Sequence, residues 1–149
     1  MWLANTTRPD IASVVCTFAC FAQEPSVQHG KAVTRILEYL TGTRNLGLTF
    51  SRHGGDILTA FADWTCADDK ESRKSVSGGA VLYGGTMIAW MWRTQRCVAT
   101  SSSEAEHISI AETAKGIMAV RQMFEFRRPR VKCPPVVVFE GNVGAMQLA

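Results

Sequence analysis

The segment Leu58-Thr59-Ala60-Phe61-Ala62-Asp63 reads as an apolar strand that ends in a carboxylate. A second carboxylate ends Ser103-Glu104-Ala105-Glu106, where a serine followed three residues later by a glutamate is typical of a capping box at a helix start. Between them, Gly84-Gly85 separates apolar runs at 79–83 and 86–92 and predicts a two-residue hairpin. The sequence therefore predicts three consecutive antiparallel strands and then a long helix.

The last part of the chain adds a strand. We expect the long helix to stop before Pro129, because a residue that precedes proline is disfavoured in a helix. Pro134-Pro135 then introduces Val136-Val137-Val138-Phe139, an apolar run suited to a buried strand. A helix between two strands favours a parallel crossover, so the element order predicts an α/β mixed sheet of three antiparallel strands, a long helix and a further parallel strand. Residues 142–149 read as a helix cut short, so we expect the domain to be truncated at the C-terminus.

Residues 1–50 predict a two-helix appendage. Thr7-Arg8-Pro9 would open the first helix, because proline suits a first helical turn, and Pro25 would close it. The second helix would start near Ser26, carry apolar residues at core spacing and stop at Gly42. The period then changes to alternation, which places a domain boundary at residues 51–56. We therefore expect a helical segment at 1–50 and an α/β domain at 51–149.

Composition sets broad limits. A chain of 149 residues with 46% hydrophobic content suits one ordinary domain or a small domain with an appendage. The formal charge of +3 gives only weak support for a nucleic-acid partner. Five cysteines without a C-x-x-C pair argue against a disulfide framework or zinc ribbon and fit a reducing compartment. The apolar run at 11–22 is too short to cross a bilayer and is patterned as a packed helix. We expect an intracellular protein, cytoplasmic or nuclear, that is not secreted and has no membrane partner.

Four motifs, in the expected order along nearly the whole chain, carry a resemblance to a known family. The chain resembles the end of the reverse transcriptase and the ribonuclease H domain of copia-type retrotransposon Pol polyproteins. The matching pieces are Ala4-Asn5-Thr6-Thr7-Arg8-Pro9-Asp10-Ile11, Arg35-Ile36-Leu37-Glu38-Tyr39-Leu40-Thr41-Gly42-Thr43, Arg73-Lys74-Ser75-Val76-Ser77-Gly78 and Ser102-Ser103-Glu104-Ala105-Glu106.

The resemblance implies a ribonuclease H-like fold at 51–149 and a reverse-transcriptase tail at 1–50. It also implies hydrolysis of the RNA strand of an RNA–DNA hybrid by two Mg²⁺ (or Mn²⁺) ions held among four carboxylates. Paired hard cations stabilise both the attacking water and the leaving oxygen, and they need oxygen ligands. The implied partners are an RNA–DNA hybrid or other nucleic acid and the remainder of a reverse transcriptase.

By this resemblance, Asp63 and Glu106 are the catalytic, metal-binding carboxylates. Taken without the resemblance, the residues favour a strand-end turn former at Asp63 and a capping-box partner at Glu106, and the resemblance reverses that preference. The family has an aspartate in the final strand, where this chain has Gly141, which offers no side-chain oxygen. Glu140 is the nearest substitute, but successive strand residues point to opposite faces, so we expect its carboxylate to face away. The fourth carboxylate would lie beyond Ala149. Two ligands of four predict weak magnesium binding and an impaired or inactive site.

Basic residues are the expected contacts to a sugar–phosphate backbone. They are Arg73 and Lys74 before the second strand and the densest basic cluster, Arg127, Arg128, Arg130 and Lys132. A solvated basic loop is the alternative interpretation of that cluster. Three functions follow: an impaired retrotransposon-derived ribonuclease H segment, an active nuclease that uses Glu140 or a partner's carboxylate, and a non-catalytic nucleic-acid-binding or assembly module. The first is the interpretation that the sequence favours.

Overall fold

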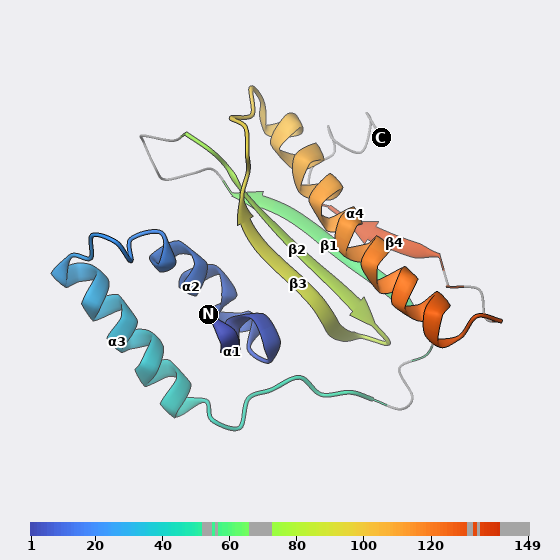
Figure 1. Ribbon diagram of the computed structural model, residues 1–149, viewed down its shortest axis with the longest axis horizontal. Coiled ribbons are helices and arrows are strands. Elements are labelled where there is room, and N and C mark those ends of the chain that lie inside the picture. The colour runs from blue at the N-terminus through green and yellow to red at the C-terminus, as the bar shows by residue number, and fades with distance from the viewer. Residues whose placement is uncertain (52–54, 56, 66–72, 131–132, 134, 141–149) are drawn as a thin grey trace. The chain divides into compact units, whose positions relative to one another are not determined.

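The chain divides into two compact units, Met1–Thr49 and Phe50–Ala149, in a computed structural model (Figure 1). The structure describes residues 1–51, 55, 57–65, 73–130, 133 and 135–140. Position 141, Lys132 and the expected C-terminal helix lie outside the described residues. Each unit is treated separately below.

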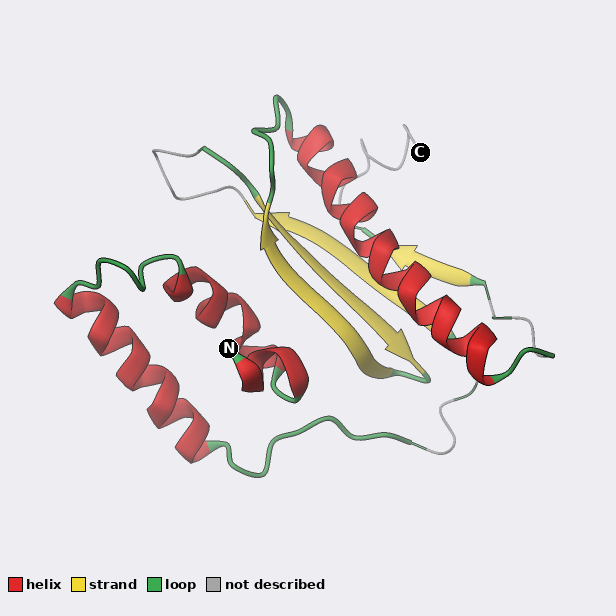
Figure 2. Cartoon of the chain, in the orientation of Figure 1, coloured by secondary structure: helices red, strands yellow, loops and turns green. Residues whose placement is uncertain are grey.

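The second unit is a four-stranded mixed sheet with one long helix along it (Figure 2). Its strands are β1 (Leu58–Thr65), β2 (Val76–Tyr83), β3 (Thr86–Thr94) and β4 (Val136–Phe139), in the order β3-β2-β1-β4. The pairs β1–β2 and β2–β3 are antiparallel, whereas β4 is parallel to β1 after the helix α4 (Ser102–Arg127). The predicted mixed α/β sheet is confirmed.

The hairpin and the core follow from the residues that sequence patterning singled out. Gly84 and Gly85 both have positive φ (55° and 79°), as a two-residue turn that matches strand twist requires. One face of the sheet packs on α4 through a cluster of buried apolar side chains: Leu58, Ala60, Val81, Ile117 and Val120. Alternation along β1 therefore assigns Ala62, also buried, to the face that α4 covers.

The start of α4 differs from the prediction. Ser101, not Ser103, is the N-cap, and its hydroxyl accepts a hydrogen bond from the Glu104 backbone N–H at 3.1 Å. Glu104 in turn accepts the Thr100 backbone N–H and hydroxyl, each at 2.6 Å. The expected capping box Ser103–Glu106 is wrong by two residues, because the pattern serine-x-x-glutamate occurs in two overlapping registers. Glu106 therefore has no capping role.

The first unit contains more helices than predicted. The expected first helix from Thr7 to Pro25 is a 3₁₀ turn (Pro9–Ile11) followed directly by α2 (Ala12–Ala19), and a further helix, α1 (Trp2–Thr6), precedes it. The helix α3 (Val27–Gly42) begins after the N-cap Ser26 and ends at Gly42, as predicted. The two-helix prediction therefore missed α1, whereas Pro9 lies in the first turn of the expected first helix, as predicted.

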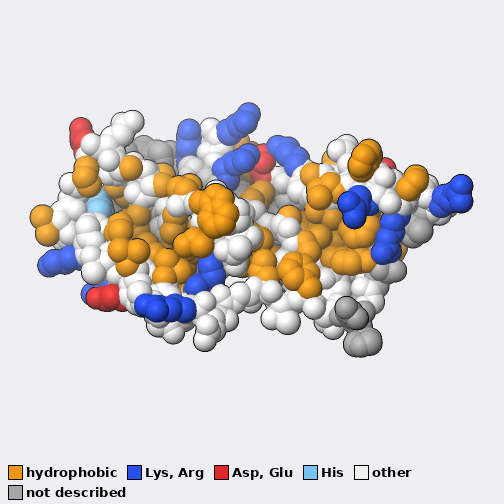
Figure 3. Space-filling view, turned by 60° about the horizontal axis from the view of Figure 1, so that its bottom comes forward, with side chains coloured by type: hydrophobic (Ala, Val, Ile, Leu, Met, Phe, Trp, Pro, Cys, Tyr) orange, Lys and Arg blue, Asp and Glu red, His pale blue; other side chains and the backbone are white. Residues whose placement is uncertain are grey.

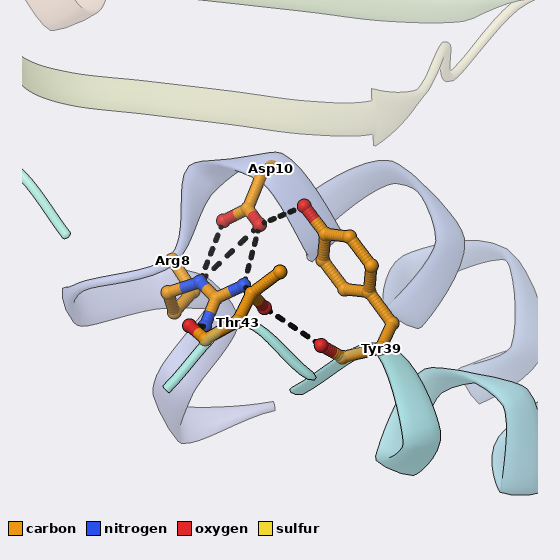
Figure 4. Close-up of polar contacts among 4 residues, drawn as sticks. All are labelled: Arg8, Asp10, Tyr39 and Thr43. Atoms are coloured by element: carbon orange, nitrogen blue, oxygen red, sulfur yellow. Dashed lines mark hydrogen bonds and ion pairs between the residues drawn. The ribbon is translucent and has the colours of Figure 1, made fainter. Parts of the chain in front are cut away.

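A polar network surrounds the turn at Pro9–Ile11. Arg8 is buried and donates hydrogen bonds to Asp10 and to Thr43, at the end of α3 (Figure 4). The Tyr39 hydroxyl donates to the same Asp10 carboxylate at 2.9 Å. Arg8 lowers the pKa of Asp10 by hydrogen bonding and charge. The turn at Pro9–Ile11 is thus tied to the C-terminal end of α3.

Apolar side chains stay exposed on both units (Figure 3). The helix α3 has no fully buried residue, and two of its apolar side chains at core spacing, Val33 and Leu37, are about half exposed. The core-spacing prediction for α3 is therefore wrong within this unit. None of the helices in the described ranges is long and apolar enough to cross a membrane.

Candidate active site

Glu106 is the most perturbed acid of the described chain. It lies near the start of α4, is 5% exposed, and its Oε2 has no hydrogen-bond partner among the described residues. Burial raises the pKa of Glu106 to about 7, reinforced by the charge of Glu140 and by hydrogen bonding to it. Hydrogen bonding to Trp64 acts in the opposite direction, and the charge of Asp63 adds a smaller increase. A buried, proton-holding carboxyl of this kind is typical of a functional site.

Glu140 lies beside Glu106, contrary to the expectation from sequence. It follows the last residue of β4, Phe139, whose ring stacks on that of Phe61 at 5.1 Å on the face away from α4. Because adjacent strand residues alternate, Glu140 turns to the face that α4 covers, which is where Glu106 lies. The alternation argument was sound, but the face assigned to Glu140 was wrong. Its Oε1 is also buried without a partner in the described chain.

Asp63 lies near the end of β1 and is exposed. It pairs with Gly78 across the sheet, and a Cβ on Gly78 would lie 3.0 Å from the Trp92 ring. Strand alternation therefore places Asp63 on the Trp92 face, opposite Ala62 and α4. Its Oδ1 accepts the Trp64 backbone N–H at 2.8 Å, and it reaches Glu106 only through charge. That Asp63 and Glu106 share a metal ion stays a prediction.

Metal-ligating side chains form no group of three or more within the described ranges. The structure brings Glu106 and Glu140 together and leaves Asp63 farther off. A pair of carboxylates offers hard oxygen ligands of the type that Mg²⁺ and Mn²⁺ prefer, but half of the four that the family resemblance implies.

Two buried polar side chains that the sequence did not single out fix the start of α4 on the sheet. The Ser109 hydroxyl is fully buried and donates to the main-chain carbonyls of Asp63 and Gly78. The Gln95 amide, 4% exposed, donates to the Ser77 hydroxyl at 3.0 Å and to the Ala105 carbonyl at 2.9 Å. A serine on the apolar stripe of a helix was the available signal for Ser109; Gln95 had none in a single sequence.

The predicted basic residues lie at opposite ends of the second unit. Arg73, which is exposed, and Lys74 precede β2 and so lie at the end of the sheet where β1 carries Asp63. Arg127, Arg128 and Arg130 are exposed at the other end of α4, roughly 30 Å from Glu106 along the helix axis. The two basic sets therefore do not line one site, and Lys132 lies outside the described residues.

Comparisons with known proteins identify the family. The chain is 38% identical over 115 residues to the secreted RxLR effector protein 161 of Plasmopara viticola, which covers 77% of this chain and 81% of that protein. It is 37% identical over 126 residues to the retrovirus-related Pol polyprotein from transposon TNT 1-94 of Nicotiana tabacum, with 84% of this chain and 9% of the polyprotein covered. For the Pol polyprotein from transposon RE1 of Arabidopsis thaliana the identity is 35% over 142 residues, with coverages of 95% and 10%.

These relatives define a class of protein, the retrovirus-related Pol polyproteins of transposons. The chain belongs to the copia-type family of these retrotransposon polyproteins. It spans about a tenth of the length of the Pol polyproteins that it matches. No family model matches the chain, and no solved structure matches it.

Proposed function

We propose that the second unit is a retrotransposon-derived ribonuclease H-like segment whose ancestral reaction is hydrolysis of the RNA strand of RNA–DNA hybrids, and that this reaction is impaired here. One observation carries the proposal: Glu106 is held buried near the start of a helix, beside the end of an antiparallel strand that carries Asp63, and it has no capping role. The copia-type relatives support the same assignment.

The acidic groups fit a divalent cation in part. The unpartnered Oε2 of Glu106 and the nearby charges of Glu140 and Asp63 are the environment that a hard cation neutralises. Glu106 would hold it from α4, the charge of Asp63 would act from the end of β1, and when bound the cation would activate water and stabilise the leaving oxygen. The position of the family's further aspartate is Gly141, which supplies no ligand. Impairment follows, because cation affinity depends on the number of charged ligands.

The nucleic acid would meet basic side chains at the same end of the sheet. Arg73 and Lys74 precede β2 at the Asp63 end, where contacts to phosphate require charge but little geometric precision. We propose that the hybrid lies across the Asp63 end of the sheet and not along α4. The arginines at the C-terminal end of α4 lie too far from Glu106 to contact the nucleotide being cleaved.

Cleavage of a labelled RNA–DNA hybrid tests the proposal. The chain and its Gly141→Asp variant are incubated with Mg²⁺ or Mn²⁺, with Gly141→Asp/Asp63→Asn as the matched control. We expect activity near background for the chain itself, a clear gain for Gly141→Asp and loss of that gain in the double variant. Full metal-dependent cleavage by the unmodified chain would contradict impairment. No gain in Gly141→Asp, in a protein that unfolds as cooperatively as the parent, would contradict the ribonuclease assignment.

A non-catalytic nucleic-acid-binding module is the second candidate function. The exposed cluster Arg127, Arg128 and Arg130, remote from the acidic groups, favours it. Binding to a hybrid would then weaken steeply with salt and be unaffected by Asp63→Asn, whereas replacing the three arginines by glutamine would reduce the salt dependence.

A further inference from the structure

Two carboxyl groups from distant parts of the sequence lie close together on the face of the sheet that α4 covers. Glu106 lies on α4 and is 5% exposed. Glu140 is the residue that follows β4. Each has one oxygen, Oε2 of Glu106 and Oε1 of Glu140, that is buried without a hydrogen-bond partner in the described chain. A buried carboxylate oxygen without a donor is costly, so a further group is needed at this point.

No basic side chain of the described residues supplies that group. The ion pairs there join Arg8 to Asp10 and Arg93 and Lys115 to Glu112, and they include neither Glu106 nor Glu140. The other groups that act on Glu106 are Trp64, a single hydrogen-bond donor, and Asp63, another acid. Within the part of the chain that the structure describes, this leaves two ways to neutralise the pair: a shared proton or a bound cation.

We propose that Glu106 and Glu140 together bind one divalent cation of the Mg²⁺ or Mn²⁺ class, with Glu140 taking the place of the carboxylate that position 141 lacks. The ligands are carboxylate oxygens without nitrogen or sulfur, which selects hard cations over zinc or copper. The approach of the two groups comes from the backbone: β4 runs parallel to β1 with Phe139 opposite Phe61, and the next residue turns to α4.

This cation site deepens the proposed function, because it names the ligands and the class of ion at the same end of the sheet. It also departs from the pattern that the resemblance implies. A cation between Glu106 and Glu140 would lie on the α4 side, whereas Asp63 projects from the opposite face of β1. The site would therefore retain an ion without completing a two-ion arrangement, which agrees with impaired cleavage.

Titration of the metal-free full chain with Mn²⁺, followed by the electron paramagnetic resonance signal of the free ion, tests the site directly. We expect one site in the chain and about tenfold or more weaker binding in Glu140→Gln and in Glu106→Gln, because each loses one of two charged ligands. Glu125→Gln is the matched control: the same chemical change at an exposed position of the same helix, with binding unchanged.

Thermal unfolding guards against a folding artefact. Millimolar Mn²⁺ should raise the Tm of the chain and of Glu125→Gln, and this increase should disappear in Glu140→Gln. Mn²⁺ binding that is equal in Glu140→Gln and the parent would overturn the inference. So would the absence of a site in the parent, in which case the two acids share a proton.

The binding and cleavage experiments separate the two proposals. Mn²⁺ binding that depends on Glu140, together with no cleavage by Gly141→Asp, would leave the cation site and remove the ribonuclease assignment. Cleavage by Gly141→Asp, together with Mn²⁺ binding that ignores Glu140, would do the reverse.

Discussion

Gly79→Ala should destabilise the second unit, because α4 packs on β2 at this glycine. A Cβ on Gly79 would lie 2.4 Å from Oγ1 and 3.3 Å from Cβ of Thr113, and 3.2 Å from Cγ of Met91. Thr113 is 2% exposed, so its side chain is enclosed by the helix and the sheet. The helix must therefore move away from the sheet or the side chains must leave their preferred rotamers.

The magnitude follows from two opposing terms. Overpacking a close interface typically costs about 1–3 kcal/mol, and the added methyl recovers at most about 0.8 kcal/mol of hydrophobic free energy. Because the contact at 2.4 Å is far inside van der Waals distance, we expect a net loss of about 2 kcal/mol in the free energy of unfolding. In a domain of this size that is a fall of roughly 8–16 °C in Tm.

Urea unfolding followed by tryptophan fluorescence measures this loss, since Trp64, Trp90 and Trp92 belong to the second unit. Gly116→Ala is the control on the same helix: its Cβ would be 3.9 Å from Val81, an ordinary contact, so it should stabilise by about 0.5–1 kcal/mol. Adding Thr113→Ala to Gly79→Ala should recover most of the loss. Equal stability of Gly79→Ala and the parent, or no recovery in the double variant, would refute the packing argument.

Three further predictions concern polar groups. The pKa of Glu106 is raised to about 7 in the folded chain, so its proton stabilises the fold fully below pH 4.5, and this contribution is lost as the pH rises through 7. Metal-free Glu106→Gln should therefore be more stable than the parent by about 1–2 kcal/mol at pH 8 and equal to it at pH 4. Urea titrations at the two pH values measure this difference. Gln95→Ala removes the donor to the Ala105 carbonyl and opens a cavity, so a loss of about 2–3 kcal/mol is expected by the same method, and an unchanged midpoint would exclude an anchoring role. Arg8→Lys cannot hold its acidic partner and Thr43 at once, so amide exchange at the end of α3 should accelerate while β1 to β3 stay protected; uniform protection would contradict the network.

The sheet and its long helix could be predicted because their signals are local. Alternation in β1, the Gly84-Gly85 turn and the 26-residue helix each depend on neighbouring residues. The N-cap residue of α4 could not be predicted, because Ser101–Glu104 and Ser103–Glu106 are equally good sequence patterns. The helix uses the first of them, and Gln95, a side chain from outside the helix, donates to the Ala105 carbonyl near its start.

The errors in the first unit and at Glu140 have one physical cause, contacts between residues far apart in sequence. Arg8, at the start of the expected first helix, binds Thr43, 35 residues later, and no local pattern reports that pairing. For Glu140 the alternation rule was correct, but choosing the face required the position of α4 relative to β4. Asp63 illustrates the same limit, since sequence placed it at a strand end but not on a face.

Ser109 and Gln95, which position the start of α4, are not themselves acids of the candidate site. An acid of the site can therefore be lost while these contacts remain. One hydroxyl, that of Ser109, binds main-chain carbonyls of both β1 and β2 and sits one helical turn after Glu106. These acceptors are backbone atoms, so losing a carboxylate elsewhere leaves the helix in register with the strand ends. Loss of ligands and loss of scaffold are therefore independent events in this fold. A single added carboxylate can then restore chemistry only if Ser109 and Gln95 still hold Glu106 in place, and abolishing rescue by Ser109→Val in the Gly141→Asp background would be the direct sign of it.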